Sequence, residues 1–485
     1  MFWDHDDDKL HEECGVFGIY GHPEASIITA LGLHALQHRG QEACGITTFD
    51  GARFHTEKGL GLVGENFRGE DMPKRLPGFA AIGHNRYSTQ GEPASRNIQP
   101  LYADLAIGGF SIAHNGNLTN ARKLRRGLVE DGAIFQSTMD TEVVMQLVAR
   151  SNRTQITDRM ISAMSQIEGG YALVGLTNGK LIGARDPVGL RPLVLGRLDN
   201  AYVLASETCA LDLIGAEFIR EIENGEIVII SDEGIESLTP FLARPARPCV
   251  FEYVYFSRPD SILHGRSVYE VRRRMGRRLA EETLQGIEAD VVVPVPDSGV
   301  PAAIGFSEVS GLPFQMGIIR SHYVGRTFIQ PSQTGRKISV SKKHAPNRAV
   351  LEGKRVVLID DSIVRGNTSE KIVQMVRDAG ATEVHFRSAS PPIKYPDFYG
   401  IDMPTKEELL ASQYNLQEMT ERLGADSLGF LSVEGLYHAI DGTPRDPQNP
   451  TYADHCFTGD YPTVLTDHSM DDSAKETQLS LLDDT

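Results

Sequence analysis

The sequence predicts a layered α+β domain followed by an α/β domain with a mainly parallel sheet. With 485 residues, the chain is too long for one ordinary hydrophobic core. Up to about residue 245, many short strand-like runs surround only two clear helical patterns, which is typical of α+β domains. Beyond residue 249, continuous apolar runs alternate with helical segments, which indicates a parallel sheet covered by helices.

The strand and helix signals of the first half fall into separate groups. Residues 14–20 and 105–116 are typical of strands, and Asn178-Gly179 between two apolar runs indicates a hairpin. Residues 25–37 and 140–149 have the apolar spacing of helices.

The second half has a different texture. Residues 268–279 carry a helical apolar stripe, and the runs DVVVPVP, RVVLID and EVHFRSAS predict buried parallel strands. The Pro- and Arg-rich stretch 243–249 indicates a boundary, so we expect domains of residues 14–245 and 249–467. The acidic tail, 468–485, is expected to be disordered.

Composition and charge exclude several functional classes. The net charge of −17 argues against nucleic acid as the main partner, but not against a small anionic substrate. No run approaches the roughly 20 apolar residues of a membrane span, and the N-terminus lacks the pattern of a secretory signal. Five sparse cysteines argue against a disulfide framework, and a cytoplasmic location is expected.

The most specific motif is VVLIDDSIVRGNTSEKI, residues 356–372. An apolar run ends in Asp360 and Asp361, a loop with Gly366 follows, and Thr368 opens a helix. A glycine loop at a helix N-terminus offers N–H groups to phosphate, and the two carboxylates can hold ribose hydroxyls or hydrated Mg²⁺. The alternative is an ordinary strand-to-helix turn capped by Thr368.

Two further segments support a phosphate site. Asp297, Ser298 and Gly299 follow the strand-like run of residues 291–296, although alone they indicate only a turn. A long polar loop within an α/β domain is often a lid, and residues 320–348 form such a segment, with Lys343 the best candidate for pyrophosphate. The basic residues of this loop are Arg326, Arg336, Lys337, Lys342, Lys343 and Arg348.

Cys14 stands directly before the first predicted strand. By itself, a lone cysteine is usually a small buried hydrophobic residue. Three polar, glycine-bearing segments beside strands are suited to contact with a small ligand: residues 36–46, 83–91 and 113–120.

Cys14 and these three segments together resemble the glutaminase domain of the N-terminal-nucleophile amidotransferases, which has αββα layers. The resemblance implies that residues 1–13 are a propeptide and that Cys14 becomes residue one. A free α-amine can then act as base for the thiol, which attacks glutamine and forms a γ-glutamyl thioester. The alternative is removal of Met1 alone, which leaves Cys14 without a free amine and inactive.

The same resemblance assigns the remaining glutaminase residues. It implies that Arg86 clamps the glutamine α-carboxylate and that Asn115 and Gly116 form the oxyanion hole. Asp140 is expected to bind the α-ammonium group, and Gly40 to line the acyl site. Cys44 is interpreted as structural, and residues 185–193 as support for the fold.

Residues 356–372 resemble the signature of the type I phosphoribosyltransferases, in which the loop that corresponds to residues 297–299 binds pyrophosphate. One Mg²⁺ per subunit is expected at Ser298, Asp360 and Asp361. Transfer develops oxocarbenium character at C1 and charge on pyrophosphate, so a cation and loop closure would assist it. The phosphoribosyl pyrophosphate (PRPP) residues implied are Asp297, Ser298, Gly299, Lys343, Asp360, Asp361, Ser362, Arg365, Gly366 and Thr368.

From Cys14 to Pro462 the chain resembles the glutamine PRPP amidotransferases, which catalyse the first committed step of purine synthesis. The family implies formation of phosphoribosylamine, glutamate and pyrophosphate, inhibition by purine nucleotides, and a homotetramer. It also implies an internal ammonia channel, to which tyrosines of residues 249–261 would contribute. The rivals are an amidotransferase for another phosphorylated sugar and a non-catalytic nucleotide sensor.

Some members of this family carry a [4Fe–4S] cluster on four cysteines. Two of the four positions match here, at Cys249 and Cys456, whereas the others carry Asp397 and Ala453. Because such clusters normally need four thiolates, we expect no cluster and interpret the thiols as structural remnants. The alternative is a cluster held by Cys249, Cys456, Asp397 and His455.

Overall fold

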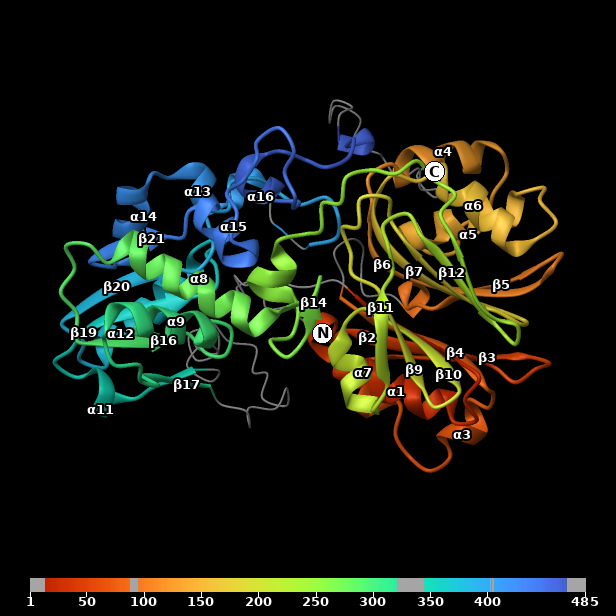
Figure 1. Ribbon diagram of the computed structural model, residues 1–485, viewed down its shortest axis with the longest axis horizontal. Coiled ribbons are helices and arrows are strands. Elements are labelled where there is room, and N and C mark those ends of the chain that lie inside the picture. The colour runs from red at the N-terminus through yellow and green to blue at the C-terminus, as the bar shows by residue number, and fades with distance from the viewer. Residues whose placement is uncertain (1–13, 88–94, 321–343, 402, 404, 469–485) are drawn as a thin grey trace, which may run out of the picture.

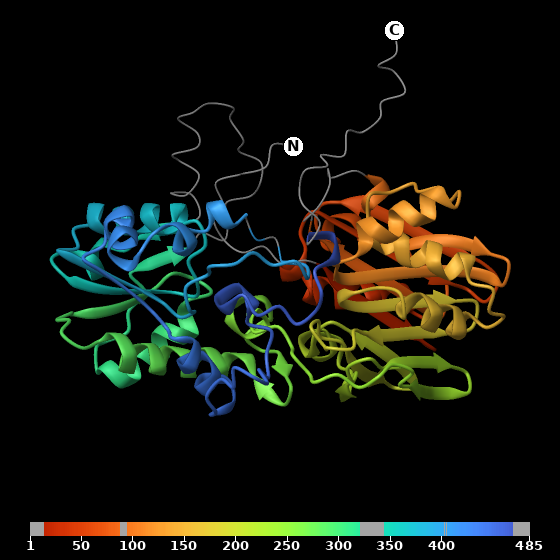
Figure 2. The same cartoon turned by 90° about the horizontal axis from the view of Figure 1, so that it is seen from above.

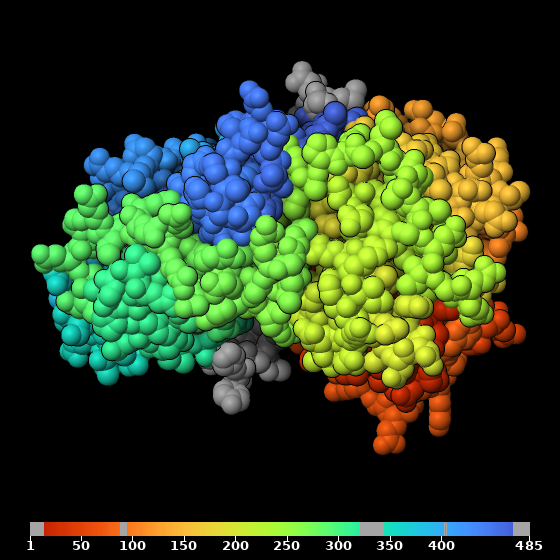
Figure 3. Space-filling model, viewed as in Figure 1, coloured from red at the N-terminus to blue at the C-terminus, as the bar shows by residue number. Residues whose placement is uncertain are grey.

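The computed structural model describes residues 14–87, 95–320, 344–401, 403 and 405–468. These residues form two lobes that lie side by side (Figures 1 and 2). The N-terminal half of the chain forms one lobe and most of the C-terminal half forms the other. The space-filling view shows that the lobes meet along a continuous contact (Figure 3).

The first lobe is built on two antiparallel sheets. The seven-stranded sheet has the order β11-β9-β10-β1-β4-β2-β3, and the six-stranded sheet has the order β13-β12-β8-β7-β6-β5. The strands of the first sheet are β1 (Gly15–Tyr20), β2 (Ala43–Phe49), β3 (Phe54–Leu60), β4 (Ala80–Arg86), β9 (Val194–Leu198), β10 (Ala201–Ala205) and β11 (Glu217–Glu221). Those of the second are β5 (Leu101–Leu105), β6 (Gly108–Leu118), β7 (Gly169–Thr177), β8 (Leu181–Arg185), β12 (Ile227–Ser231) and β13 (Gly234–Leu238).

Successive side chains of a strand point to opposite faces of a sheet, so each sheet can present an apolar face to the other. The two sheets pack face to face through these apolar faces. Val16 and Ile82 of the first sheet share one buried cluster with Ala113 and Val174 of the second. The outer face of the seven-stranded sheet is covered by α1 (Ala25–Ala35) and α7 (Thr208–Ile214). The other outer face is covered by α4 (Ala121–Glu130), α5 (Asp140–Arg150) and α6 (Ile156–Met164). The expected αββα layering is confirmed.

The second lobe contains a parallel sheet with the order β16-β19-β20-β21. Its strands are β16 (Val291–Pro294), β19 (Arg355–Asp360), β20 (Glu383–Ser388) and β21 (Ser427–Phe430). One face packs against α8 (Val268–Thr283), α9 (Val300–Ser310) and α15 (Val433–Asp441). The other packs against α12 (Asn367–Asp378), α13 (Leu410–Gln413) and α14 (Leu416–Leu423). The expected α/β domain with a mainly parallel sheet is confirmed, and three of its four strands, β16, β19 and β20, are those that the apolar runs predict.

Short elements connect these layers. They are η1 (Gln37–Arg39), α2 (Val63–Asn66), α3 (Met72–Arg75), η2 (Ser95–Asn97), η3 (Glu252–Phe256), β14 (Ile262–Leu263), β15 (Arg266–Ser267), β17 (Ile318–Arg320), β18 (His344–Pro346), α11 (Arg348–Leu351), η4 (Lys406–Glu408), α16 (His455–Thr458) and η5 (Thr466–His468). The hairpin predicted at Asn178-Gly179 joins β7 to β8.

The chain crosses between the lobes more than once. Residues 239–248, which include most of the Pro- and Arg-rich stretch 243–249, form neither helix nor strand. Near its described end the chain returns to the first lobe, where Asp467 accepts hydrogen bonds from the N–H groups of Arg122 (2.7 Å) and Lys123 (3.1 Å). Since these N–H groups lie in the first turn of α4, Asp467 caps that helix from 345 residues away in sequence.

Candidate active sites

Strand pairing brings Cys14 next to Arg86. In the antiparallel pair of β1 and β4, Gly15 faces Asn85, so the preceding residue, Cys14, lies opposite Arg86. The Cys14 thiol is buried, and its sulfur lies 3.9 Å from the carbonyl oxygen of Tyr87. Cys14 has a φ of 63°, in the left-handed region that residues other than glycine rarely adopt.

Asn115 approaches this place from the facing sheet. Ala80 and Ile82 point between the sheets, and the alternation continues that direction to His84 and Arg86. His84 spans the gap, since its Nε2 lies 3.1 Å from the carbonyl oxygen of His114. By the same alternation from Ala113, Asn115 points into the same space. The strand ends therefore bring together the residues expected to attack, clamp and stabilise glutamine.

The Asn115 side chain has an unused hydrogen-bonding capacity. It is fully buried, and within the described part of the chain neither its Oδ1 nor its Nδ2 has a hydrogen-bond partner. Buried amides are normally satisfied, so such a group is typical of a site that awaits a ligand. Its N–H₂ group is of the right type to bind a developing oxyanion.

Glycine is required at both glycine positions of this site. Gly116 has a φ of 132°, and a β-carbon there would lie 2.1 Å from the carbonyl oxygen of Gly170. At Gly40, a β-carbon would lie 2.7–2.9 Å from the backbone atoms of Arg86. Gly40 therefore lets η1 approach the end of β4 and is a neighbour of the Arg86 backbone.

Asp140 is the first residue of α5 and is held from two sides. Its Oδ2 accepts a hydrogen bond from the N–H of Leu118 (3.0 Å), and its Oδ1 lies 3.4 Å from Nδ1 of His114. Burial acts to raise the pKa of Asp140, but His114 and the backbone donors hold this pKa below its ordinary value. Asp140 is thus a largely buried carboxylate next to β6, in a position where it could bind an ammonium group.

Two other predicted features of this lobe have clear structural surroundings. The Cys44 side chain is fully buried and its pKa is raised to about 12 by desolvation, which fits a structural cysteine. In the segment of residues 185–193, the Asp186 carboxylate accepts hydrogen bonds from the N–H groups of Val188, Leu190 and Tyr171. This carboxylate organises the segment, in line with a supporting role.

The second candidate site lies at the carboxyl edge of the parallel sheet. A β-carbon at Gly299 would lie 2.5 Å from the carbonyl oxygen of Ile359 and 3.3 Å from Cα of Asp360. The loop of residues 297–299 therefore lies directly beside the acid pair, as the two sequence motifs imply. Both Asp360 and Asp361 are at least nine-tenths buried.

Polar groups converge on this edge. Ser298 Oγ is buried and has no hydrogen-bond partner within the described residues. Asp361 accepts a hydrogen bond from the Ser362 hydroxyl (2.8 Å). Gly366 precedes α12 with a φ of 87°, and the helix begins at Asn367, one residue before the predicted Thr368. Arg365 lies 3.9 Å from Glu408.

The arms of the predicted lid touch this site. Arg320 on β17 donates to Asp297 (2.5 Å), and Nε2 of His344 on β18 lies 3.2 Å from the carbonyl oxygen of Pro296. Arg320 and His344 are register partners, so the described residues on either side of the predicted lid lie beside the loop of residues 297–299. Lys343 lies outside the described residues, so its assignment remains a prediction.

The donor set at this edge fits Mg²⁺. Mg²⁺ prefers oxygen ligands from one or two carboxylates and substrate phosphates, and keeps several waters. All the ligand atoms that Asp360, Asp361 and the partnerless Ser298 hydroxyl offer to a metal ion are oxygens. The ion is expected here because of this chemistry.

The four cluster positions lie together, but they do not fit a [4Fe–4S] cluster. Cys249 pairs with Ala453 through backbone bridging, and Asp397, His455 and Cys456 hold side-chain atoms within 4.8 Å of one another. All are buried. With two thiolates instead of four, and with Asp397 bonded to His455 at 2.6 Å, the group lacks the ligands of a cluster. Asp397, His455 and Cys456 lie close enough together to ligate a single metal ion.

Sequence reasoning missed a buried ionic network between the lobes. Arg39, next to Gly40, forms ion pairs with Glu207 and, at 2.5 Å, with Glu252 of η3. Arg191 lies 3.5 Å from the other oxygen of Glu252. Burial acts to raise the pKa of Glu252, but the two arginines hold it below its ordinary value. The arginine next to Gly40 was the available signal for this network, because a buried arginine needs an acidic partner.

The expected channel tyrosines differ in their surroundings. Tyr253 is fully buried and donates a hydrogen bond to the carbonyl oxygen of Leu263 (2.9 Å). Tyr255 is only partly buried. A contribution to a channel remains a prediction.

An αββα sandwich with a cysteine at its strand ends, joined to a phosphoribosyltransferase-type sheet, defines a two-site amidotransferase. The family profile of the glutamine amidotransferase domain matches residues 84–213, and that of the phosphoribosyl transferase domain matches residues 261–389. No described helix is long and apolar enough to cross a membrane.

The relatives cover nearly the whole chain. An amidophosphoribosyltransferase of Rhizobium etli is 59% identical, over 95% of this chain and 94% of its own. A chloroplastic amidophosphoribosyltransferase of Arabidopsis thaliana is 51% identical, over 96% of this chain and 81% of its own. The solved PRPP amidotransferase of Bacillus subtilis, in complex with ADP and GMP, is 48% identical with a TM-score of 0.88, over 93% of this chain and 98% of its own. The chain belongs to the amidophosphoribosyltransferase family.

Proposed function

We propose that Cys14 releases ammonia from glutamine and that the Asp360–Asp361 site joins this ammonia to PRPP. The products are 5-phosphoribosylamine, glutamate and pyrophosphate, the first committed step of purine synthesis. The family membership supports the overall reaction. The observation that carries the residue assignment is the pairing of Cys14 opposite Arg86, with the partnerless Asn115 amide facing them.

The glutaminase half-reaction follows from these residues. The Cys14 sulfur attacks the carboxamide carbon, and its proton passes through the α-amine to the departing ammonia. Asn115 and the N–H of Gly116 stabilise the oxyanion while the C–N bond breaks. Water then cleaves the thioester, which gives glutamate and restores the thiol. Arg86 and Asp140 hold the α-carboxylate and α-ammonium groups of glutamine.

The backbone of Cys14 supports removal of the leader, residues 1–13. A left-handed φ at a residue other than glycine costs on the order of 1–3 kcal/mol. This torsion is defined by the carbonyl carbon of residue 13. Cleavage before Cys14 removes that atom, so the strain disappears as the amine that the chemistry needs becomes free.

The synthetase half-reaction uses the edge of the parallel sheet. Asp360 and Asp361 hold the ribose hydroxyls, while the N–H groups at the start of α12, near Gly366 and Thr368, bind the 5-phosphate. Asp297, Ser298 and Gly299 bind pyrophosphate, and residues 320–348, with Lys343, close over it. When bound at Ser298, Asp360 and Asp361, Mg²⁺ would neutralise charge on the leaving pyrophosphate.

The wider setting is also a proposal. A relative solved with ADP and GMP supports inhibition of this chain by purine nucleotides. A homotetramer and a cytoplasmic location are what the family resemblance implies. The sensor alternative is disfavoured, since a sensor needs no Cys14, Arg86 and Asn115 constellation.

Two variants test whether the two sites carry out separate half-reactions. Cys14→Ala is expected to abolish glutamine-dependent pyrophosphate release but to preserve the reaction with ammonium salts. Asp361→Asn is expected to cripple both reactions, because it alters the shared acceptor site. If Cys14→Ala retains glutamine-dependent activity, the assignment of Cys14 is wrong, and a fully active Asp361→Asn would refute the acceptor site.

A further inference from the structure

We propose that Asp397 and His455 form an anchor that fixes the loop of residues 396–401 against β6 and thereby positions the oxyanion groups Asn115 and Gly116. Both are positioning residues for the glutaminase reaction. The inference rests on the proposed function, because it assumes that Asn115 and Gly116 form the oxyanion hole. It also gives a role to the Asp397 carboxylate, which stands at one of the four cluster positions.

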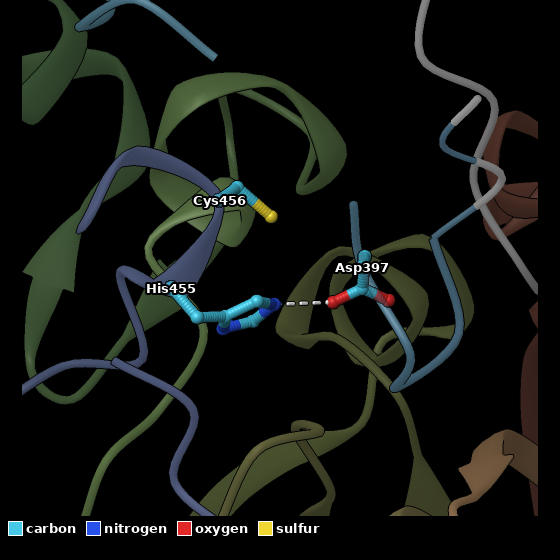
Figure 4. Close-up of side chains that lie close together, drawn as sticks. All are labelled: Asp397, His455 and Cys456. Carbon is cyan, nitrogen blue, oxygen red and sulfur yellow. Dashed lines mark hydrogen bonds and ion pairs between the residues drawn. The ribbon is translucent and has the colours of Figure 1, made fainter. Parts of the chain in front are cut away.

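The anchor is a buried hydrogen bond between His455 and Asp397. Nε2 of His455 donates to Oδ1 of Asp397 at 2.6 Å, and both side chains are buried (Figure 4). The His455 ring points from the short helix α16 towards Asp397, and the Cys456 thiol lies on the same side of that helix (Figure 4). In a buried setting such a hydrogen bond is strong, and loss of one partner leaves the other unsatisfied.

The second oxygen of Asp397 shapes the loop itself. Oδ2 accepts hydrogen bonds from the N–H groups of Tyr399 (2.8 Å) and Ile401 (2.7 Å). Asp397 thus ties the loop together with one oxygen and ties it to α16 with the other. The aromatic rings of Tyr399 and Tyr461 pack against the His455 ring, with centroids 5.1 and 5.0 Å away.

The anchored loop contacts the glutaminase lobe at two carbonyl groups. Asn117 donates from Nδ2 to the carbonyl oxygen of Phe398 (2.9 Å). Arg191 donates to the carbonyl oxygen of Tyr399 through Nε (3.2 Å) and Nη2 (3.0 Å). Both carbonyls belong to the segment whose N–H groups Asp397 holds, so the position of Asp397 determines where these acceptors lie.

Asn117 connects the loop to the oxyanion groups. It follows Gly116 directly and pairs with Gly170, whose carbonyl oxygen limits position 116 to glycine. A β-carbon at Gly170 would lie 3.3 Å from Cβ of Tyr399, so the loop also packs on the neighbouring strand. Because oxyanion stabilisation depends on sub-ångström placement, a loosened loop should slow glutamine hydrolysis without touching the PRPP site.

The test compares His455→Ala, which removes the donor, with His455→Gln, whose amide can still donate to Asp397. We expect His455→Ala to lower kcat with glutamine about fivefold, the rate equivalent of a hydrogen bond of ~1 kcal/mol. The KM for PRPP and the ammonium-dependent rate should stay within about twofold of wild type. His455→Gln should recover most of the lost rate.

Asn117→Ala gives a second variant that leaves the buried anchor intact. It should show the same selective loss of kcat with glutamine. The double variant Asn117→Ala/His455→Ala should have a kcat no lower than that of the more impaired single variant, because both substitutions break the same connection between the loop of residues 396–401 and β6. Additive losses, equal losses with glutamine and ammonium, or unchanged kcat values would overturn the proposal. Failure of the proposed function is seen separately, as glutamine-dependent activity that survives Cys14→Ala.

Discussion

Gly299 lies against the backbone of Asp360, so close that a β-carbon at position 299 would stand 3.3 Å from the Asp360 Cα and 2.5 Å from the Ile359 carbonyl oxygen. This contact joins the two motifs that we propose bind PRPP, which stand about 60 residues apart in sequence, into one site.

Gly299→Ala should therefore separate the two loops. The methyl group meets backbone atoms, which cannot rotate away, so the loop of residues 297–299 must shift. We expect PRPP affinity to fall by at least about tenfold, since pyrophosphate contacts of ~1.4 kcal/mol or more are displaced. Calorimetric titration with PRPP measures this. Affinity equal to wild type would contradict the proposed loop geometry.

Gly116→Ala should impair only the glutaminase. The substitution places a β-carbon 2.1 Å from the Gly170 carbonyl oxygen and strains a φ of 132°. Glutamine-dependent turnover should fall by about 100-fold or more, comparable to loss of an oxyanion donor, whereas the ammonium-dependent rate should remain.

Gly127→Ala is the matched control for both glycine variants. Gly127 lies within α4, and nothing lies within 4 Å of an added β-carbon. Alanine there should stabilise the helix by about 0.5–1 kcal/mol and leave both activities unchanged. Reduced activity of this control would show that the activity losses of Gly299→Ala and Gly116→Ala are not specific to the two sites.

The buried His84 should make stability depend on pH. Desolvation lowers its pKa from 6.5 to about 3, so between these values the unfolded chain binds a proton that the folded chain does not. Stability therefore rises with pH through this window and is lost on acidification, by up to ~1.4 kcal/mol per pH unit. The free energies of unfolding of wild type and His84→Gln, measured from pH 6.5 to 4.5, should converge as the pH falls. Parallel curves would contradict this origin.

Iron analysis tests the altered cluster positions. Asp397 is already bonded to His455, and the four positions supply two thiolates. Enzyme purified without oxygen should contain far less than the roughly four irons and matching sulfide of a cubane cluster. About four irons per chain, with the broad visible absorbance of a cluster, would show that oxygen and nitrogen ligands replace the missing cysteines.

The features that could be predicted from the sequence are local. The acid pair, the glycine loop and the helix after it are contiguous, so the local sequence of residues 356–372 is enough to predict how they are arranged. Relationships across the fold could not be read in this way. The contact of Gly40 with Arg86, the hydrogen bond of Asn117 to Phe398 and the capping of α4 by Asp467 depend on packing between distant segments. Nor does any periodicity indicate the left-handed φ of Cys14.

The charged residues show the same limit. Arg39 stands in a string that suggested ligand contact, yet it pairs with Glu207 and Glu252 at the junction of the lobes. Its partners lie 168 and 213 residues away, so only the assembled fold identifies them. The sequence thus indicated candidate residues for each site but not the ionic contacts that connect the lobes.

The central claim is that Cys14 acts as an N-terminal nucleophile, and the intact mass of the active enzyme tests it most directly. Enzyme that turns over glutamine should have a mass that begins at Cys14, and a preparation that retains residues 1–13 should use ammonium salts alone. A glutamine-active enzyme that still carries any residue before Cys14 would contradict the account, because its thiol would lack the free α-amine.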